Sequence, residues 1–275
     1  MQDILAYTDN FRSPWKPAVE YAGRLAVTLG ASLTGAYVYP SPLYTAPRFS
    51  SPDLIAAIFQ NARRLEAEAA AAREPFVQWA KVLGVVRPSW HVAEGDVPDA
   101  MAQIATWHDL LVLDVNKDET WGSPSDVAMI VLATHLPTIV VSSDVREPRL
   151  ECIALAWNGA PEAVRAIHAS MPLLQRAKRV VLLRGEQRNS FLDITWKPPF
   201  EVETHLARHG IKFDERNIDT DDEHAGAALL EAASDVDANL LVMGAYGRTR
   251  FSEWALGGAT RHVLNHARLP VFMRH

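Results

Sequence analysis

Four glycines near the end of the chain have the spacing that most suggests chemistry: Gly244, Gly247, Gly257 and Gly258. They follow the apolar run 240–243, which is typical of a strand buried on both faces of a sheet. We expect a helix to begin near Ser252 and to carry the last two glycines in its first turns. Glycine lets a backbone approach a ligand closely, and N–H groups at a helix N-terminus bind phosphate. The pattern therefore predicts a phosphate-binding loop between a strand and a helix.

These glycines do not match the two most familiar phosphate-binding patterns. The spacing is neither that of the P-loop, which ends in Gly-Lys-Ser/Thr, nor that of the Gly-x-Gly-x-x-Gly fingerprint. A glycine-lined turn could also serve only to pack a helix closely against its strand. Ligand binding is favoured because several glycines gather at the carboxyl end of a strand, where open α/β sheets bind their ligands.

The spacing Gly-x2-Gly-x9-Gly resembles the nucleotide-binding signature of the universal stress protein family, which ends in Gly-Ser/Thr. Gly258 stands where the family has Ser or Thr, and the nearest hydroxyl belongs to Thr260. The resemblance implies that the chain binds ATP or a related adenine nucleotide such as ADP or AMP, which Mg²⁺ could accompany. It implies a hydrogen bond from Asn158 to a base or sugar edge, a contact from Ile218 to adenine, and contacts from Met243 and Gly244 to ribose. The phosphates would lie against Gly247, Arg248, Gly257, Gly258, Ala259 and Thr260.

Strands and helices are expected to alternate along the whole chain. In the first half we expect strands at 4–7, 32–39, 89–93, 110–113 and 138–141, and helices at 17–29, 51–83 with a kink or interruption at Pro75, 97–107 and 126–134. In the second half we expect strands at 152–156, 179–183, 211–218, 240–243 and 270–273, and helices at 161–174 and 225–234. This order predicts an α/β fold made of doubly wound, mostly parallel, five-stranded sheets.

The two halves resemble each other, which indicates an internal duplication. Segments 131–140 and 263–272 align, and each places Leu-Pro before the last strand. We therefore predict two Rossmann-like domains in tandem, residues 1–144 and 150–275, joined by a polar linker. The universal stress protein family includes such tandem forms.

The first half lacks the glycines at the equivalent place. Asp114, Asp118 and Glu119 stand there, and their charge would repel a triphosphate. We therefore expect one nucleotide site per chain, in the second half.

Composition restricts the class of protein. The 275 residues are 48% hydrophobic and 22% charged, which is usual for a globular protein. The net charge of −6 argues against a nucleic-acid binder, and no apolar stretch is long enough to cross a membrane. The single cysteine, Cys152, excludes an intrachain disulfide and is expected to be a buried, inert thiol. A cytoplasmic protein is predicted.

Neither catalytic residues nor a metal site is predicted. The acidic residues Asp219, Asp221, Asp222 and Glu223 could contact a metal, but a polar loop before the next helix is the simpler interpretation. His205 with His209, and His262 with His266, have a spacing that can bind zinc, but no third ligand is evident. We expect at most slow ATP hydrolysis, because no base or set of carboxylates for phosphoryl transfer can be named.

Two alternative functions, from other functional classes of protein, stay open. The chain could be a nucleotide-independent interaction protein, with Gly258 and Asn158 marking a degenerated site. It could instead be an enzyme of adenine-nucleotide chemistry, because related α/β folds host such enzymes. For the favoured tandem, nucleotide-binding protein we expect the two halves to associate as a pseudo-dimer through 138–141 and 270–273, and whole chains could form a homodimer.

Overall fold

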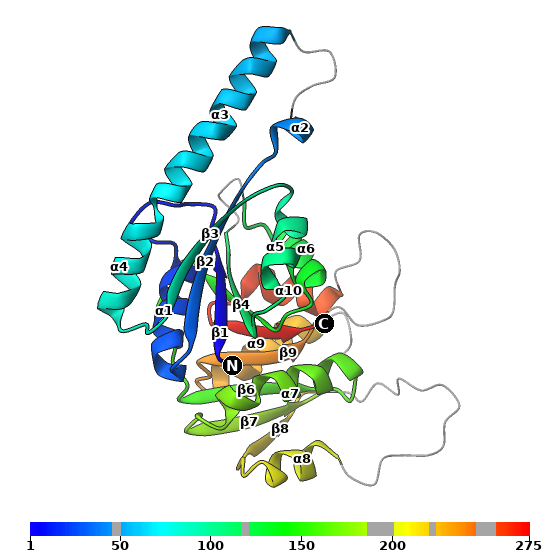
Figure 1. Ribbon diagram of the computed structural model, residues 1–275. Coiled ribbons are helices and arrows are strands. Elements are labelled where there is room, and N and C mark those ends of the chain that lie inside the picture. Colours follow the sequence, from blue (N-terminus) through cyan, green and yellow to red (C-terminus); the bar gives the residue numbers. More distant parts are fainter. Residues whose placement is uncertain (46–50, 117–120, 186–200, 220–223, 246–256) are drawn as a thin grey trace. The chain divides into compact units, whose positions relative to one another are not determined.

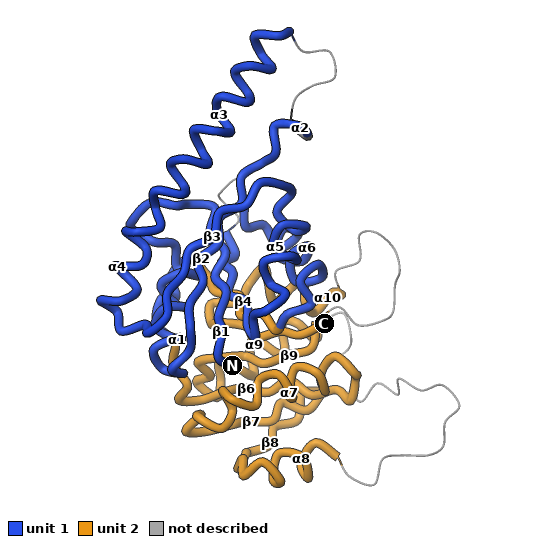
Figure 2. Tube along the Cα trace, in the orientation of Figure 1, with its two compact units in different colours: residues 1–136, 143–147 blue, residues 137–142, 148–275 orange. Residues whose placement is uncertain are grey.

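The computed structural model describes the chain except for residues 46–50, 117–120, 186–200, 220–223 and 246–256 (Figure 1). Two compact units can be distinguished, unit 1 with residues 1–136 and 143–147, and unit 2 with residues 137–142 and 148–275 (Figure 2). Strands and helices alternate in both units, and the sheets are mostly parallel. The predicted α/β, Rossmann-like fold class is confirmed.

Unit 1 contains a parallel sheet of order β3-β2-β1-β4. Its strands are β1 (Asp3–Tyr7), β2 (Ser32–Tyr39), β3 (Pro88–Glu94) and β4 (Leu110–Val115). Its helices are α1 (Pro17–Leu29), α2 (Pro42–Thr45), α3 (Pro52–Ala71), α4 (Arg73–Leu83), α5 (Val97–Ala105) and α6 (Pro124–Thr134). Helices α1 and α4 lie on one face of this sheet, and α5 and α6 lie on the other (Figure 1).

The ends of α1 illustrate how local sequence sets the elements of unit 1. Pro17 occupies the first turn, where its missing N–H costs nothing, and Gly30 ends the helix at φ 66°. The stripe of buried residues between them packs on β1 and β4, which are themselves largely apolar and buried. This is why the helix could be predicted with its observed bounds.

The helix predicted over 51–83 is interrupted, but the break lies three residues before Pro75. The long helical region breaks at Ala72, which ends α3 and begins α4, and Pro75 lies in the first turn of α4. A proline is tolerated there because the N–H groups of a first turn have no partner within their own helix.

Unit 2 contains a sheet of order β5-β10-β9-β6-β7-β8. Its strands are β5 (Thr138–Ser142), β6 (Cys152–Trp157), β7 (Arg179–Arg184), β8 (Asp214–Asn217), β9 (Leu240–Gly244) and β10 (Val271–Arg274). Its helices are α7 (Pro161–Leu174), α8 (Val202–Arg208), α9 (Ala225–Asp235) and α10 (Gly258–His266). Helix α7 packs on one face, and α9 with α10 on the other (Figure 1). Strand β5 pairs antiparallel with β10, whereas neighbouring strands from β10 to β8 pair in parallel.

Strand β8 is shorter than the predicted 211–218. Its four residues are polar and exposed, and they pair with β7 along the edge of the sheet. Charged residues are common on edge strands because they discourage pairing with another chain. The apolar Ile211, which suggested an earlier start, is buried outside the ladder.

The segment predicted as a linker is held against α1. Arg146 Nη1 lies 3.0 Å from Glu20 Oε2, and Arg24 Nε lies 2.8 Å from Glu147 Oε1. These contacts explain why residues 143–147 belong to unit 1 rather than to a free connection.

Candidate functional site

The candidate site lies at the carboxyl ends of the parallel strands of unit 2. Strands β6 and β9 are neighbours, with Leu155 opposite Val242, but the chain leaves them toward opposite edges of the sheet. Such a switch in connection direction opens a crevice outside the strand ends, where ligands of α/β sheets bind. The residues after β6 and β9 are therefore the first to consider.

Gly244, the last residue of β9, has a packing role that only glycine can fill. A Cβ added there would lie 2.6 Å from Ala163 N and 2.7 Å from the Cγ of Glu162. The first turn of α7 therefore reaches the end of β9 at backbone distance. Met243 beside it is buried, so its side chain belongs to the core and only its backbone faces the strand ends.

Helix α10 begins at Gly258, and the start predicted near Ser252 lies outside the described residues. Gly257 is its N-cap, with φ −52° and ψ 135°, and Gly258 is the first helical residue. A Cβ on Gly258 would meet nothing within 4 Å, whereas the side chain of Thr260 is buried in the first turn. No side chain of the described residues caps this helix, so the N–H groups of Gly258 and Ala259 face outward without a capping partner from that part of the chain.

Asn158, predicted to contact the base or the sugar, and Ile218, predicted to contact adenine, both follow strands at this end of the sheet. Asn158 follows β6, and its Oδ1 accepts a hydrogen bond from Ala160 N at 3.1 Å, which shapes the turn into α7. Ile218 follows β8, and its N–H donates to Arg184 O at 2.7 Å, so its carbonyl is the backbone group left for a base. The predicted phosphate contacts Gly247 and Arg248 lie outside the described residues.

Two buried donors at this edge were not predicted from the sequence. Trp157 Nε1, at the end of β6, and Arg274 Nη1, at the end of β10, are both buried without a hydrogen-bond partner in the part of the chain described. Arg274 lies beside Gly244 in the parallel β9–β10 register, and its carbonyl accepts from Ala245 N. A buried unpaired donor is costly, so such groups call for an acceptor.

Arg274 has a second positive charge, that of Arg165, near it. Burial lowers the pKa of Arg274, and the positive charge of Arg165 on α7 lowers this pKa further. A nearby anion would offset both effects. Arg165 and Arg274 are 109 positions apart in the sequence. Their proximity could have been predicted only from evidence that α7 packs on β10.

Residues 160–275, which include all of these elements from α7 to β10, match the model of the Universal stress protein family. Unit 2 carries a universal stress protein domain. This establishes the predicted family for the matched residues. No curated protein matches the chain in sequence.

Solved structures similar to the whole chain support the fold. A universal stress protein from Archaeoglobus fulgidus DSM 4304 has a TM-score of 0.68 at 13% identity, over 99% of this chain and 95% of its own. A functionally unknown protein from Pseudomonas aeruginosa PAO1 has a TM-score of 0.56 at 15% identity, over 100% of this chain and 92% of its own. At these identities the likeness concerns the fold alone.

Unit 1 differs from the universal stress protein domain at the position equivalent to Gly244. Asp114 stands there, buried at the end of β4. Its side chain borders a pocket of about 240 Å³, which is lined by Pro14, Trp15, Lys16, Pro17, Asp114, Asn116, Ser143 and Arg146. In unit 2, Gly244 allows α7 to approach the end of β9 closely. In unit 1, Asp114 at the equivalent position borders a pocket at the start of α1.

One of the two histidine pairs contacts a third histidine, and the members of the other pair stack on each other. His205 lies between His168 and His209, with ring centroids 4.4 Å and 4.6 Å apart, and His262 stacks on His266 at 4.2 Å. Among the described residues, no group of three His, Cys, Asp or Glu side chains is arranged to hold a metal. Asp221, Asp222 and Glu223 fall outside those residues.

Cys152 is buried, as predicted, and burial raises the pKa of its thiol. No helix in the described part of the chain combines the length and the apolar character needed to span a bilayer.

Proposed function

We propose that the universal stress protein domain of unit 2 binds an adenine nucleotide, ATP, ADP or AMP, at the carboxyl ends of β6, β9 and β10. The observation that carries this proposal is a pair of buried donors, Trp157 Nε1 and Arg274 Nη1, that have no acceptor among the described residues; Arg274 lies beside Gly244. A nucleotide supplies many acceptor atoms and a negative charge, which is what these groups lack. The N-terminus of α10, which no described side chain caps, adds N–H groups suited to phosphate.

Within this proposal the predicted contacts keep their roles. Asn158 and Ile218 would face the base, Met243 and Gly244 the ribose, and the phosphates would lie against Gly247, Arg248, Gly257, Gly258, Ala259 and Thr260. Mg²⁺ could accompany the phosphates. Arg274 is added as a further contact to an anionic group.

We further propose a regulatory role in a stress response, in the cytoplasm, with at most slow hydrolysis. The domain limits would be 1–144 and 150–275. Asp114 in place of the glycine argues against a nucleotide in the first domain, because its carboxylate would repel phosphate. A pseudo-dimer of the two domains is supported by the antiparallel pairing of β5 with β10.

The first experiment is to denature the purified protein, identify released small molecules by mass spectrometry, and titrate ATP, ADP and AMP by calorimetry. We expect about one nucleotide per chain. Two per chain would contradict the role given to Asp114, and neither release nor binding heat would favour the interaction-protein alternative. Turnover above about 1 per second with magnesium would favour the enzyme alternative.

A variant pair tests the observation behind the proposal. Arg274→Gln should weaken ATP binding about tenfold or more, because a charge-assisted hydrogen bond is lost. The matched control is Arg176→Gln, which changes an exposed arginine just beyond α7 and should leave affinity unchanged. Equal affinities in the two variants would remove Arg274 from the site.

A further inference from the structure

The pocket of unit 1 at the start of α1 is a candidate site separate from the one proposed in unit 2. All of the residues that line it belong to unit 1. Asp114 borders it at the position where unit 2 has Gly244, whose missing Cβ lets a helix approach the strand end closely. The pocket thus accompanies a departure from the glycine pattern, so its ligand need not be a nucleotide.

The volume of the pocket limits the size of its ligand. Its 240 Å³ give room for about eight water molecules at about 30 Å³ each, and so for an organic molecule of about six to ten non-hydrogen atoms. Pockets for drug-sized ligands have about 300–1,000 Å³. An adenine nucleotide is too large for this pocket, and a small metabolite fits.

The wall formed by the end of β4 favours a positive group. Asp114 is 3% exposed and borders the pocket together with Asn116, which follows β4. A carboxylate and an amide oxygen both accept hydrogen bonds, and an ammonium group has three donors and no acceptor. A charge-assisted bond between ammonium and carboxylate is among the strong ones, whereas phosphate would be repelled from this wall.

The wall formed by the start of α1 favours a carboxylate. Lys16 is the N-cap of this helix and Pro17 its first residue, and no described side chain caps it. The first N–H groups of a helix and its dipole attract anions. Arg146 borders the same pocket, and within the described structure it donates only through Nη1, to Glu20 Oε2 at 3.0 Å and Trp15 O at 3.5 Å. Its other N–H groups can therefore donate to a ligand.

Ion pairs balance the two cations of the pocket. Lys16 Nζ lies 3.3 Å from Asp9 Oδ1, and Arg146 Nη1 lies 3.0 Å from Glu20 Oε2. The pocket therefore has no excess positive charge that would attract a polyanion. A ligand that carries one positive and one negative group, without net charge, can use both walls.

We propose that the pocket of unit 1 binds a free α-amino acid. Its ammonium group lies against Asp114 and Asn116, and its carboxylate lies against Arg146 and the N-terminus of α1. An α-amino acid carries both charges within the size that the pocket admits, and Pro14 and Pro17 offer apolar contact to its side chain. This proposal does not depend on nucleotide binding in unit 2.

A thermal-shift screen of the full chain, with each of the twenty standard amino acids at about 10 mM, tests the proposal. At least one amino acid should raise the Tm, and calorimetry should give it a Kd below about 1 mM. Its analogues without the amino group or without the carboxyl group should each bind at least about tenfold more weakly, because each loses a charge-assisted hydrogen bond. Amide hydrogen exchange should slow in α1 and β4 when the amino acid is bound.

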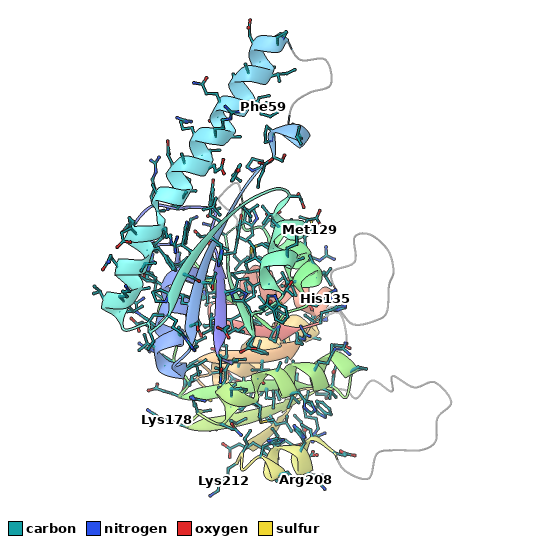
Figure 3. The ribbon with its side chains drawn as sticks, in the orientation of Figure 1. Phe59, Met129, His135, Lys178, Arg208 and Lys212 are labelled. Atoms are coloured by element: carbon teal, nitrogen blue, oxygen red, sulfur yellow. The ribbon has the colours of Figure 1, made fainter. Side chains whose placement is uncertain are left out.

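Two variants with matched controls test the assigned contacts. Asp114→Asn and Arg146→Gln should each weaken binding of that amino acid at least about tenfold. Asp144→Asn, at an exposed position, and Arg208→Gln, on the surface of α8 in unit 2 (Figure 3), should bind it like wild type. Circular dichroism checks that the variants fold, and Arg146 is exposed, so its variant serves even if Asp114→Asn is unstable.

Three results would each overturn the proposal. The first is that none of the twenty amino acids stabilises the protein. The second is that the analogue without the amino group binds as tightly as the amino acid, or that Asp114→Asn and Arg146→Gln both keep wild-type affinity. The third is that the amino acid protects β9 and β10 from exchange instead of α1 and β4, which would place it in unit 2.

Discussion

Gly244 has two roles, one in helix packing and one in the proposed ligand site. Its missing Cβ allows the first turn of α7 to reach the end of β9, and its backbone lies beside Arg274, where we place an anionic ligand. A loss of binding in a Gly244 variant would therefore not by itself distinguish a ligand contact from a packing defect. Stability has to be measured together with affinity.

Gly244→Ala should destabilise unit 2 by about 1–3 kcal/mol, because the added methyl would overlap backbone atoms that cannot move aside cheaply. Gly258→Ala is the matched control, since its Cβ meets nothing within 4 Å and alanine favours the helix by up to about 1 kcal/mol. Urea denaturation measures both. Equal stability of the two variants would contradict the close packing at Gly244.

His205 makes the stability of unit 2 depend on pH. Burial lowers its pKa, and the neighbouring His168 and His209 lower the pKa further. The unfolded chain then binds a proton more readily than the folded one, so this contribution is complete above about pH 6.5 and is lost as the pH falls below it.

Urea denaturation at about pH 7.5 and about pH 5 should show this loss in wild type and a smaller loss in His205→Phe. His91→Phe, an exposed position on β3, should keep the wild-type dependence. The same pH dependence in all three proteins would exclude His205 as its source.

At the scale of elements, aromatic residues hold α4 against the sheet of unit 1. The ring of Phe76 lies 5.4 Å from that of Trp15 and 5.1 Å from that of Trp90, and all three side chains are buried. Gly35 on β2 makes room for them, since a Cβ there would lie 2.6 Å from Trp90. Trp90 Nε1 also donates to Ala69 O at 2.8 Å, which ties the base of α3 to β3.

Phe76→Ala should therefore cost about 3–5 kcal/mol of the stability of unit 1, through lost burial and the cavity that remains. Val82→Ala on the same helix should change stability by less than about 0.5 kcal/mol, because its side chain is exposed. Tryptophan fluorescence during urea unfolding reports on this cluster. A small cost for Phe76→Ala would mean that α4 is held by other contacts.

At the scale of the whole molecule, the two units are expected to respond differently to one ligand. A nucleotide that binds unit 2 alone stabilises it by RT ln(1 + [L]/Kd), about 2.7 kcal/mol at a hundredfold excess over Kd. Amide hydrogen exchange with ATP should slow in β9, β10 and α10. Exchange in β1 and β4 should stay unchanged, and equal protection there would indicate a second site.

Local sequence was sufficient for most elements, because the signals that define them act over a few residues. Pro17 and Gly30 bound α1, Ser51 caps α3, and continuous apolar runs predicted the buried strands. The errors have the same origin. Pro75 and Ile211 each offered a plausible local signal, but the helix breaks at Ala72, three residues before Pro75, and edge pairing sets the start of β8.

The sequence by itself thus determined the α/β class, the repeated halves and the glycine pattern at the end of β9, since these depend on composition, periodicity and spacing. Only the tertiary structure revealed that Trp157 and Arg274 have buried donors without acceptors among the described residues, that Gly244 admits α7, and that Asp114 borders a pocket at the start of α1. The physical reason is that burial and hydrogen-bond satisfaction depend on neighbours distant in the chain. Arg165 and Arg274 approach each other only because α7 packs on β10.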